Sequence, residues 1–531
     1  MNIIQVTFFN LGFPISLIKI LIRKRKMAMG RKQGVILSYI LMIFEVLSTL
    51  LLTPFLLRTL GQAEFGVYKL VTGITAYLLL LDLGVGNSIV KFISQYRINN
   101  DIECEKKFVA VGLVFYITVA IIAAMAGVVL SLLFPTVFSK GLTADEIILG
   151  QKLLLLTMAN ATVTIGTTLF NNILIAYEKF NISKGFSIFQ IIIRIILTFA
   201  VLKTGLGSLG VVLVNLLLTV LTRGFFVVYV FFILKVRPQY SGVSFDFIKI
   251  IIKYSSLILV QMVATQINAS LDRILLGAFV ASSAEIISVY SIGTQVVQYF
   301  QSIGNSFTGV LMPGVVRIVE QNASCKTICR EMVRIGRLTL IVLGIIWSGF
   351  LVLGKQFVDL WAGTANSNAY YVAILLMTAY LFIAIEAIGT QILWAKNEHK
   401  EQSWMKLGIV LLNIVLTIFL IKWNPLLGAT IGTFISLIIG DVIITNVVFV
   451  KRIGISLKQY YMGLFKGLWL CLLISVGAGF AINLLPINGW IGLIIKICLI
   501  CTIYFVSLLT FGMNKYEKQL LVSLIKNKKI K

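Results

Sequence analysis

The chain has 531 residues, of which 59% are hydrophobic and only 12% charged, and its formal net charge is +26. Soluble proteins carry about 25% charged residues, so the composition excludes an ordinary water-soluble enzyme or binding domain. Apolar runs of about 20 residues, enough to cross a ~30 Å hydrocarbon layer, recur from end to end and predict an all-α integral membrane protein.

Residues 1–33 form the first predicted segment, which is cytoplasmic or lies at the membrane surface. An apolar stretch that ends near Ile22 is followed by the basic run 23–26, the reverse of the charge order of a signal peptide. Two interpretations stay open. The segment is an interfacial element, or translation begins at Met27 or Met29.

About fourteen transmembrane helices follow. They are predicted at 34–57, 69–91, 108–132, 151–176, 187–203, 209–234, 254–280, 287–316, 335–354, 369–395, 404–422, 426–450, 463–483 and 490–512. The polar loop 235–253 separates six spans from six. We therefore expect an N-terminal lobe at 34–240, a C-terminal lobe at 241–450, and two further helices with a basic tail at 451–531.

Short motifs recur across the two predicted lobes. Arg58–Tyr68 resembles Arg273–Tyr290, and Gly86–Ser88 resembles Gly304–Ser306. Both copies join an odd-numbered span to the next one. This is the pattern of a parallel repeat about an axis along the membrane normal, an arrangement found in transporters.

The basic residues are distributed unevenly between alternate loops. With the N-terminus inside, the outer loops hold few cations beyond Arg58, Lys140, Lys355 and Lys422, whereas the inner loops and tails hold most of the rest. This is the positive-inside pattern, and it predicts an even number of spans with both termini cytoplasmic. The positive charge therefore reports topology and attraction to anionic lipid, and nucleic acid is not expected as a partner.

Metal and cofactor chemistry has little support in the sequence. Cys498 and Cys501 have metal-like spacing, but no second pair or nearby histidine accompanies them, and His399 lies in a predicted inner loop. No Gly-rich nucleotide-binding loop is present, so ATP is not expected as the direct energy source. We predict no cofactor.

Polar side chains follow helical spacing inside the apolar runs. Gln261, Thr265, Asn268 and Asp272 step by four, three and four, which places them on one face of a helix. Polar groups are costly in hydrocarbon, so such faces turn toward other helices or water. Interhelical hydrogen bonds could account for a single stripe, but stripes on at least five helices favour a hydrated central cavity.

Ionisable residues near mid-bilayer are the strongest candidates for function. Arg194 and Arg223 carry planar guanidinium groups, which suit phosphate. The other positions expected to line the cavity are Asn160, Asn171, Gln190, Gln261, Asn268, Asp272, Arg273, Gln295 and Gln298. The carboxylates expected to balance charge or to carry a coupling proton or sodium ion are Glu45, Asp82, Glu386 and Asp441. Internal ion pairs that merely hold helices together are the structural alternative.

Three stretches resemble a known family. They are Leu52–Tyr68, Leu81–Phe92, and Leu271–Gly277 followed by Val289-Tyr290-Ser291. They are similar to sequences of the Wzx-type polysaccharide flippases, which belong to the multidrug/oligosaccharidyl-lipid/polysaccharide exporter superfamily. The resemblance spans roughly residues 30–450 and implies two six-helix lobes around a cavity, usually with two more helices.

The resemblance also implies a function. Such proteins export oligosaccharide units linked to undecaprenyl pyrophosphate across the bacterial cytoplasmic membrane, and a polysaccharide polymerase and assembly machinery are implied partners. A drug or cation exporter of the same superfamily is the main alternative, and it predicts an aromatic, acidic cavity. A polysaccharide polymerase or ligase is a more distant alternative. Such an enzyme commonly needs a large extracytoplasmic domain, whereas no outer loop of this chain exceeds about twenty residues, the length of one membrane span.

Overall fold

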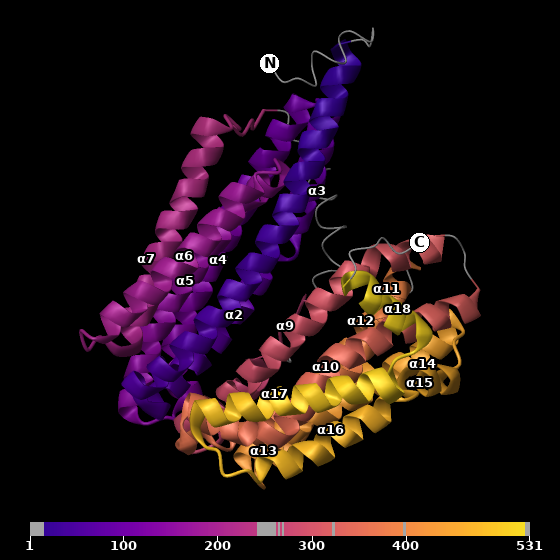
Figure 1. Ribbon diagram of the computed structural model, residues 1–531. Helices are drawn as coiled ribbons and strands as arrows, with labels where there is room; N and C mark the ends of the chain where they lie inside the picture. The colour runs from indigo at the N-terminus through magenta and orange to yellow at the C-terminus, as the bar shows by residue number, and fades with distance from the viewer. Residues whose placement is uncertain are drawn as a thin grey trace. The chain divides into compact units, whose positions relative to one another are not determined.

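The computed structural model describes residues 15–241, 262–263, 266–267, 270–320, 324–396 and 400–525. Every regular element in these ranges is helical (Figure 1). The chain divides into two compact units. Unit 1 comprises residues 1–61, 74–137 and 145–263, and unit 2 comprises residues 62–73, 138–144 and 264–531.

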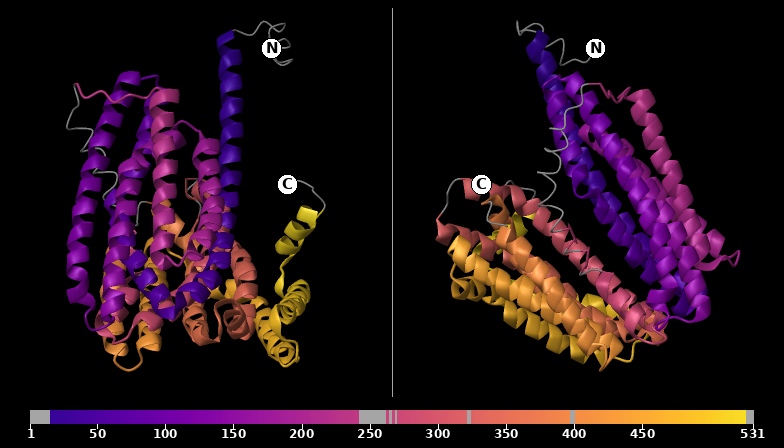
Figure 2. Two further views of the ribbon diagram at one scale, coloured as in Figure 1. Left: turned by 90° about the vertical axis from the view of Figure 1, so that its left-hand side faces the viewer. Right: turned by 180° about the vertical axis from the view of Figure 1, so that it is seen from behind.

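Unit 1 is built mainly from the first half of the chain. Its helices are α2 (Ile15–Leu78, of which 62–73 belong to unit 2), η1 (Leu79–Asp82), α3 (Val85–Ile98), α4 (Ile102–Phe138), α5 (Ala144–Ala176), α6 (Phe180–Leu202), α7 (Gly207–Val228) and the π-helical turn η2 (Tyr229–Ile233). They run side by side in both views of Figure 2. Residues 15–33, predicted as part of a separate segment, are helical and continuous with the first predicted span.

Unit 2 holds helical residues 270–279 and all later elements. These are α9 (Ala284–Glu320), α10 (Cys325–Ala362), η3 (Thr364–Asn366), α11 (Ala369–Ala395), α12 (Lys400–Leu420), α13 (Pro425–Leu437), η4 (Ile438–Ile444), α14 (Thr445–Val448), η5 (Phe449–Ile453), α15 (Leu457–Phe465), α16 (Leu468–Asn483), α17 (Gly489–Ser507), η6 (Leu508–Gly512) and α18 (Lys515–Ile525). Helix α11 packs between α9 and α10, and α16 and α17 pack on α10 and on each other.

The described ranges contain nine helices long and apolar enough to span a membrane, or ten if the bent pair α15–α16 counts as one. The first, Ile36–Ile98, has 63 residues, which would extend about 95 Å at 1.5 Å per residue. That is about three times the hydrocarbon thickness, so it must contain more than one crossing. The all-α membrane fold is confirmed, whereas the number fourteen stays a prediction.

The predicted connection at 58–68 is shorter than expected, because it is reduced to a kink between two helices. Helix continues through this stretch and is interrupted only at Gly61, whose φ of 77° and ψ of 173° are not helical. Glycine adopts a positive φ without the steric cost of a Cβ, so it can break the helix here. The predicted outer loop 133–150 is likewise reduced to residues 139–143, because α4 and α5 extend beyond the apolar spans.

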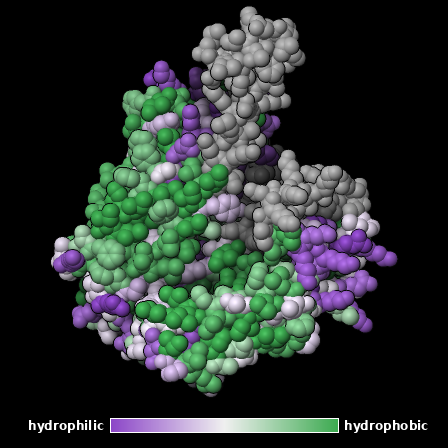
Figure 3. Space-filling model, viewed as in Figure 1, coloured by the Kyte–Doolittle hydropathy of each residue, from purple (hydrophilic) through white to green (hydrophobic). Residues whose placement is uncertain are grey.

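Apolar side chains cover the outside of the helices. On α4, Ile117, Ile121, Met125 and Val128 follow one another at three- and four-residue steps and are all exposed. Figure 3 shows wide apolar surfaces along the helices, with hydrophilic groups gathered near helix ends. An exposed apolar stripe of this length is the expected surface toward lipid.

A polar anchor ties the α5–α6 turn of unit 1. The Tyr177 hydroxyl donates to Glu105 Oε1 at 2.5 Å, and the Arg97 guanidinium lies 3.7 Å from the centre of the Tyr177 ring. Arg97 also donates to the Ala176 carbonyl at 2.9 Å. Burial, followed by the contact with Glu105, raises the pKa of the Tyr177 hydroxyl, so it remains a donor.

Candidate functional site

The two embedded arginines of unit 1 have few partners. Arg194 on α6 donates through Nη2 to Ser48 Oγ at 3.4 Å, and its buried Nε has no partner. The Arg223 guanidinium on α7 lies 6.0 Å from the Phe226 ring centre. Within the described ranges neither arginine approaches a carboxylate within 4.0 Å. Both are therefore half-buried cations without a countercharge among the described residues.

The embedded acids of unit 1 also lack the expected ionic partners. Asp82 accepts a hydrogen bond from the Tyr116 hydroxyl at 2.6 Å, and Glu45 on α2 is exposed. Neither joins an ion pair among the residues that the structure describes. In these ranges, the structural alternative of neutralising ion pairs has no support for these four charges.

Amide groups of unit 1 lie on the adjoining helices α5 and α6. Asn171 Oδ1 accepts a hydrogen bond from Ser183 Oγ at 2.7 Å, which joins the two helices. The Asn160 Oδ1 atom is buried without a partner, and Gln190 is half-buried. One amide therefore holds helices together, while the others retain capacity for hydrogen bonds to water or a ligand.

A buried carboxylate in unit 2 is surrounded by oxygen atoms. Asp272 is 2% exposed, and its oxygens accept hydrogen bonds from Tyr290, Thr417 at 3.3 Å and Thr433 at 2.6 Å. Asn413 Oδ1 lies 3.0 Å from the Thr417 hydroxyl and 3.3 Å from that of Thr433. The arrangement offers several oxygen ligands to a small cation, or a caged site for a proton.

Two cations of unit 2 meet at residues 69–73 of α2. Arg273 donates to Ser270 Oγ at 3.1 Å, and its guanidinium carbon would lie 3.4 Å from a Cβ placed on Gly73. Lys69, one turn before Gly73, donates to Gln295 Oε1 at 3.1 Å. Lys69 was not among the predicted positions, because it stands at the edge of an apolar run rather than inside it.

The remaining predicted residues of unit 2 have varied settings. Glu386 is 1% exposed and accepts from Asn446 Nδ2 at 2.9 Å and from Tyr461, while its Oε2 atom has no partner. Asp441 lies 3.9 Å from Lys406 Nζ, and Gln298 is exposed. Gln261, Thr265 and Asn268 lie outside the described residues.

Sequence reasoning missed a buried ion pair. Arg337 on α10 donates from Nε to Glu517 Oε1 on α18 at 2.6 Å, with exposures of 5% and 2% for the two side chains. The same guanidinium donates to the carbonyls of Lys466 at 2.7 Å and Gly512 at 2.6 Å. Both residues lie near predicted helix ends, where charge is ordinary, so the sequence carries no signal for this contact.

The hydroxyl cage was also missed, although a signal exists. Asn413 and Thr417 are four residues apart on α12, the spacing that marked the other polar stripes. Among the described residues no group of three His, Cys, Asp or Glu side chains could hold a metal ion. A cation at Asp272 would therefore rely on hydroxyl and amide oxygens.

Residues 31–319, more than half of the chain, match the family model described as polysaccharide biosynthesis protein. The chain belongs to this family. No curated protein matches the chain. The match covers α2 to α9, and so includes Arg194, Arg223 and Asp272.

Several solved structures are similar to this chain over most of its length. It is similar to the lipid II flippase MurJ in an inward closed conformation, with a TM-score of 0.68, 17% identity, and coverage of 90% of this chain and 97% of that one. It is also similar to a multidrug resistance MATE family transporter of the MOP superfamily in an inward-facing conformation. The TM-score is 0.60 and the identity 14%, and the match covers 78% of this chain and 94% of that one. A third similar structure is a MOP superfamily transporter from Pyrococcus furiosus. Its TM-score is 0.54 and its identity 16%, and the match covers 80% of this chain and 96% of that one. The chain thus has the MOP transporter fold and is a multi-pass membrane protein.

Proposed function

We propose that this protein is a flippase that carries lipid-linked oligosaccharides across the bacterial cytoplasmic membrane for surface polysaccharide synthesis. Undecaprenyl pyrophosphate is the proposed lipid carrier. The proposed mechanism is alternating access to a central cavity between two six-helix lobes. Membership of the polysaccharide biosynthesis family supports the pathway, and the MOP fold supports transport. Polymerase and assembly proteins would act on the exported units.

The unpaired cations of unit 1 carry the proposal. A charged side chain near a helix centre costs about 2.5–3.5 kcal/mol on insertion scales, so an unneutralised pair needs a functional reason. Arg194 and Arg223 have no carboxylate within 4.0 Å in the described ranges. A diphosphate passing these residues would supply the missing negative charge, and guanidinium can bind it through two parallel hydrogen bonds.

The cations of unit 2 offer a second contact for the same head group. Lys69 Nζ donates to Gln295 Oε1, and Arg273 Nη2 donates to Ser270 Oγ. Lysine acts as a flexible point charge and arginine as a planar fork. We propose that Lys69 and Arg273 also bind the diphosphate at a stage of transport.

The oxygen cage at Asp272 is the proposed coupling site. A fully buried carboxylate is stable when it is protonated, or when a bound cation neutralises it. The hydroxyls of Thr417 and Thr433 and the amide oxygen of Asn413 could complete the coordination of sodium. Binding at this site in unit 2 would bias the transporter between its states.

A drug or cation exporter is the alternative function. It would require an acidic cavity. The embedded charges of unit 1 without an ion pair in the described ranges are two arginines and two acids, so they do not by themselves decide between the two functions. Expression in drug-sensitive cells tests this alternative, and rescue of growth would favour it over oligosaccharide export.

The test of the proposed function removes each arginine in the bacterium that carries the gene. Arg194→Ala and Arg223→Ala are each expected to lower surface polysaccharide at least about tenfold, since a charge-assisted hydrogen bond contributes ~1.5–3 kcal/mol. Arg→Lys variants should retain partial function. Lys203→Ala, an exposed residue just after α6, is the matched control, and immunoblots of membranes verify equal protein levels.

A double variant separates phosphate binding from charge balance. If Arg194 only offsets Glu45, then Arg194→Ala combined with Glu45→Gln should restore export, because no uncompensated charge remains. Recovery of surface polysaccharide in that strain would refute the binding role of Arg194.

A further inference from the structure

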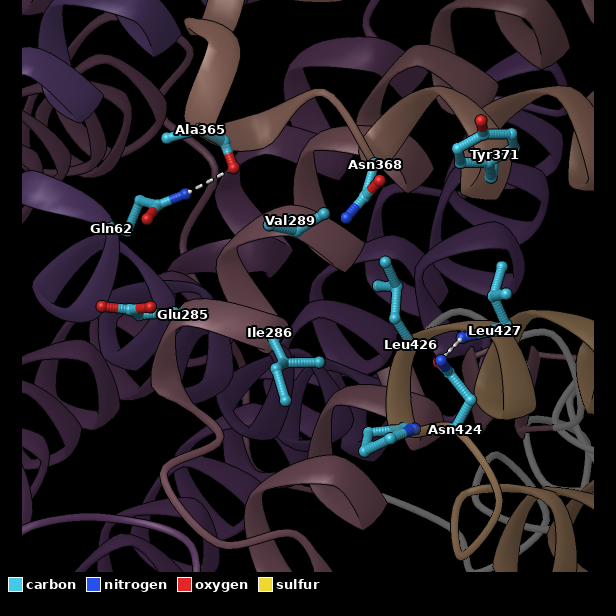
Figure 4. A pocket seen from close by; sticks show the side chains of 11 residues that line it. Gln62, Glu285, Ile286, Val289, Ala365, Asn368, Tyr371, Asn424, Leu426 and Leu427 are labelled. Atoms are coloured by element: carbon cyan, nitrogen blue, oxygen red, sulfur yellow. Dashed lines mark hydrogen bonds between the residues drawn. The ribbon is translucent and has the colours of Figure 1, made fainter.

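A pocket of about 520 Å³ lies within unit 2, where the connections between helices meet (Figure 4). Its polar lining consists of Gln62, Glu285, Asn368, Tyr371 and Asn424, and Leu426 belongs to its apolar lining. The volume lies within the range of roughly 300–1,000 Å³ that is typical of small-ligand sites. All four contributing turns are ones that the charge pattern predicts to be extracytoplasmic.

Hydrogen bonds and close backbone packing hold the wall of the pocket. Gln62 Nε2 donates to the Ala365 carbonyl at 3.2 Å and to Asn366 Oδ1 at 2.9 Å. A Cβ on Gly66 would lie 1.8 Å from the carbonyl oxygen of Ala284, so the segment after Gly61 packs directly on the start of α9. The pocket is therefore preformed, which reduces the entropy cost of binding.

The inner surface of the pocket retains unused hydrogen-bonding capacity. In the part of the chain that the structure describes, the Asn368 amide, the Tyr371 hydroxyl and the Glu285 carboxylate make no side-chain hydrogen bond. Asn424 Oδ1 accepts from the Leu427 amide at 2.9 Å, and its Nδ2 remains a donor. Hydrogen-bond donors and acceptors thus both line the cavity.

The apolar part of the lining offers surfaces on which the ring of a sugar can pack. Tyr371 is 45% exposed as a residue, and Figure 4 shows Asn368 and Tyr371 on the side of the pocket opposite Leu426 and Leu427. An aromatic ring with nearby aliphatic groups can pack against the C–H face of a pyranose, while amides and carboxylates bind its hydroxyls.

The charge of the lining argues against a phosphate. Glu285 is the one ionisable acid among the lining residues, and no lysine or arginine lines the pocket. Three helices, α9, α11 and α13, begin here and favour negative charge, but Glu285 occupies the first turn of α9 and offsets part of that effect. An uncharged, hydroxyl-rich ligand fits these groups best.

We propose that this pocket binds an uncharged sugar residue of the oligosaccharide on the extracytoplasmic side of unit 2. The inference rests on the proposed export function for its biological role, but the binding itself does not depend on transport. A sugar site built from residues other than the proposed phosphate-binding cations would allow the protein to recognise the oligosaccharide separately from its lipid carrier. It would hold the sugars on the outer face as the unit is released.

The test is a binding measurement on the purified full chain in lipid nanodiscs. Saturation-transfer NMR titrations would use the methyl glycosides of glucose, galactose and N-acetylglucosamine, with methyl glucuronide and inorganic phosphate as anionic probes. At least one neutral glycoside should bind the wild type. Asn368→Ala with Tyr371→Ala should raise its dissociation constant at least about tenfold, the equivalent of 1.4 kcal/mol.

The controls address folding and location. Thr364 is an exposed residue in the neighbouring turn and is not one of the residues that line the pocket. The Thr364→Ala variant should therefore bind the glycoside with the affinity of the wild type. The single variants Asn368→Ala and Tyr371→Ala should each weaken binding less than the pair. Equal thermal unfolding midpoints would verify that the variants fold.

Several outcomes would overturn the proposal. These are the absence of binding by every neutral glycoside, unchanged binding in the double variant, or binding of phosphate or glucuronide alone. Failure of the proposed function would be distinguishable, because loss of export in the arginine variants is measured in cells and does not involve this pocket.

Discussion

The two units treat embedded charge in opposite ways. In unit 1, Arg194 and Arg223 lie in apolar helices with a serine hydroxyl and an aromatic ring as their nearest described partners. In unit 2, Asp272, Glu386 and Arg337 are nearly inaccessible and are each held by two or more side-chain or backbone groups.

This contrast separates two uses of polarity in a membrane protein. A buried charge that several groups hold specifies how helices pack, because a competing arrangement would leave it unsatisfied. A half-buried charge without a countercharge contributes little to packing and remains able to bind a ligand. Apart from the proposed coupling site at Asp272, mutations of the buried charges of unit 2 are therefore expected to change stability, whereas mutations of Arg194 and Arg223 in unit 1 are expected to change transport.

The largest expected effect is on coupling at the oxygen cage. Asp272→Asn keeps the volume of the side chain but removes the charge that a proton or sodium ion would neutralise, so surface polysaccharide should fall at least about tenfold. Asp82→Asn in unit 1, where one tyrosine hydroxyl contacts the carboxylate, should change export much less. Equal losses in the two strains would mean that both units carry the coupling role.

The next effect is on the stability of unit 2. Glu517→Gln leaves Arg337 as a buried charge without its carboxylate and should cost about 3–5 kcal/mol of unfolding free energy. Glu103→Gln removes an ion pair of the same 2.6 Å length, formed with Lys107 on an exposed surface of α4, and should cost at most ~1 kcal/mol. Thermal unfolding in detergent compares the two. Similar shifts would show that burial does not govern these pairs.

The smallest expected effect concerns backbone packing. Gly66→Ala would place a Cβ against the Ala284 carbonyl, and overpacking of this kind costs about 1–3 kcal/mol or more. Gly224→Ala on α7 of unit 1 meets open space and should stabilise the helix by up to ~1 kcal/mol. Unfolding midpoints that move in the same direction would contradict this difference between the units.

Much of the fold could be predicted from composition and periodicity. The apolar runs correspond to α4 through α7 and to α10, α11 and α13, because hydrocarbon forces each spanning segment to satisfy its own backbone hydrogen bonds as a helix. The helix ends were less predictable. Residues 62–68 are helical and belong to unit 2, where Gly66 packs on the Ala284 carbonyl, and local sequence does not report such a contact.

Some features of the candidate site could likewise be predicted from the sequence, and others could not. The sequence by itself determined the membrane class, the embedded charges and the faces on which they lie, since helical spacing alone sets which residues share a face. Only the tertiary structure decided which of these groups have partners. Thr433 lies 161 positions after Asp272, and Glu517 lies 180 positions after Arg337. Contacts of that range depend on how helices pack together, a property of the whole chain that no local pattern records.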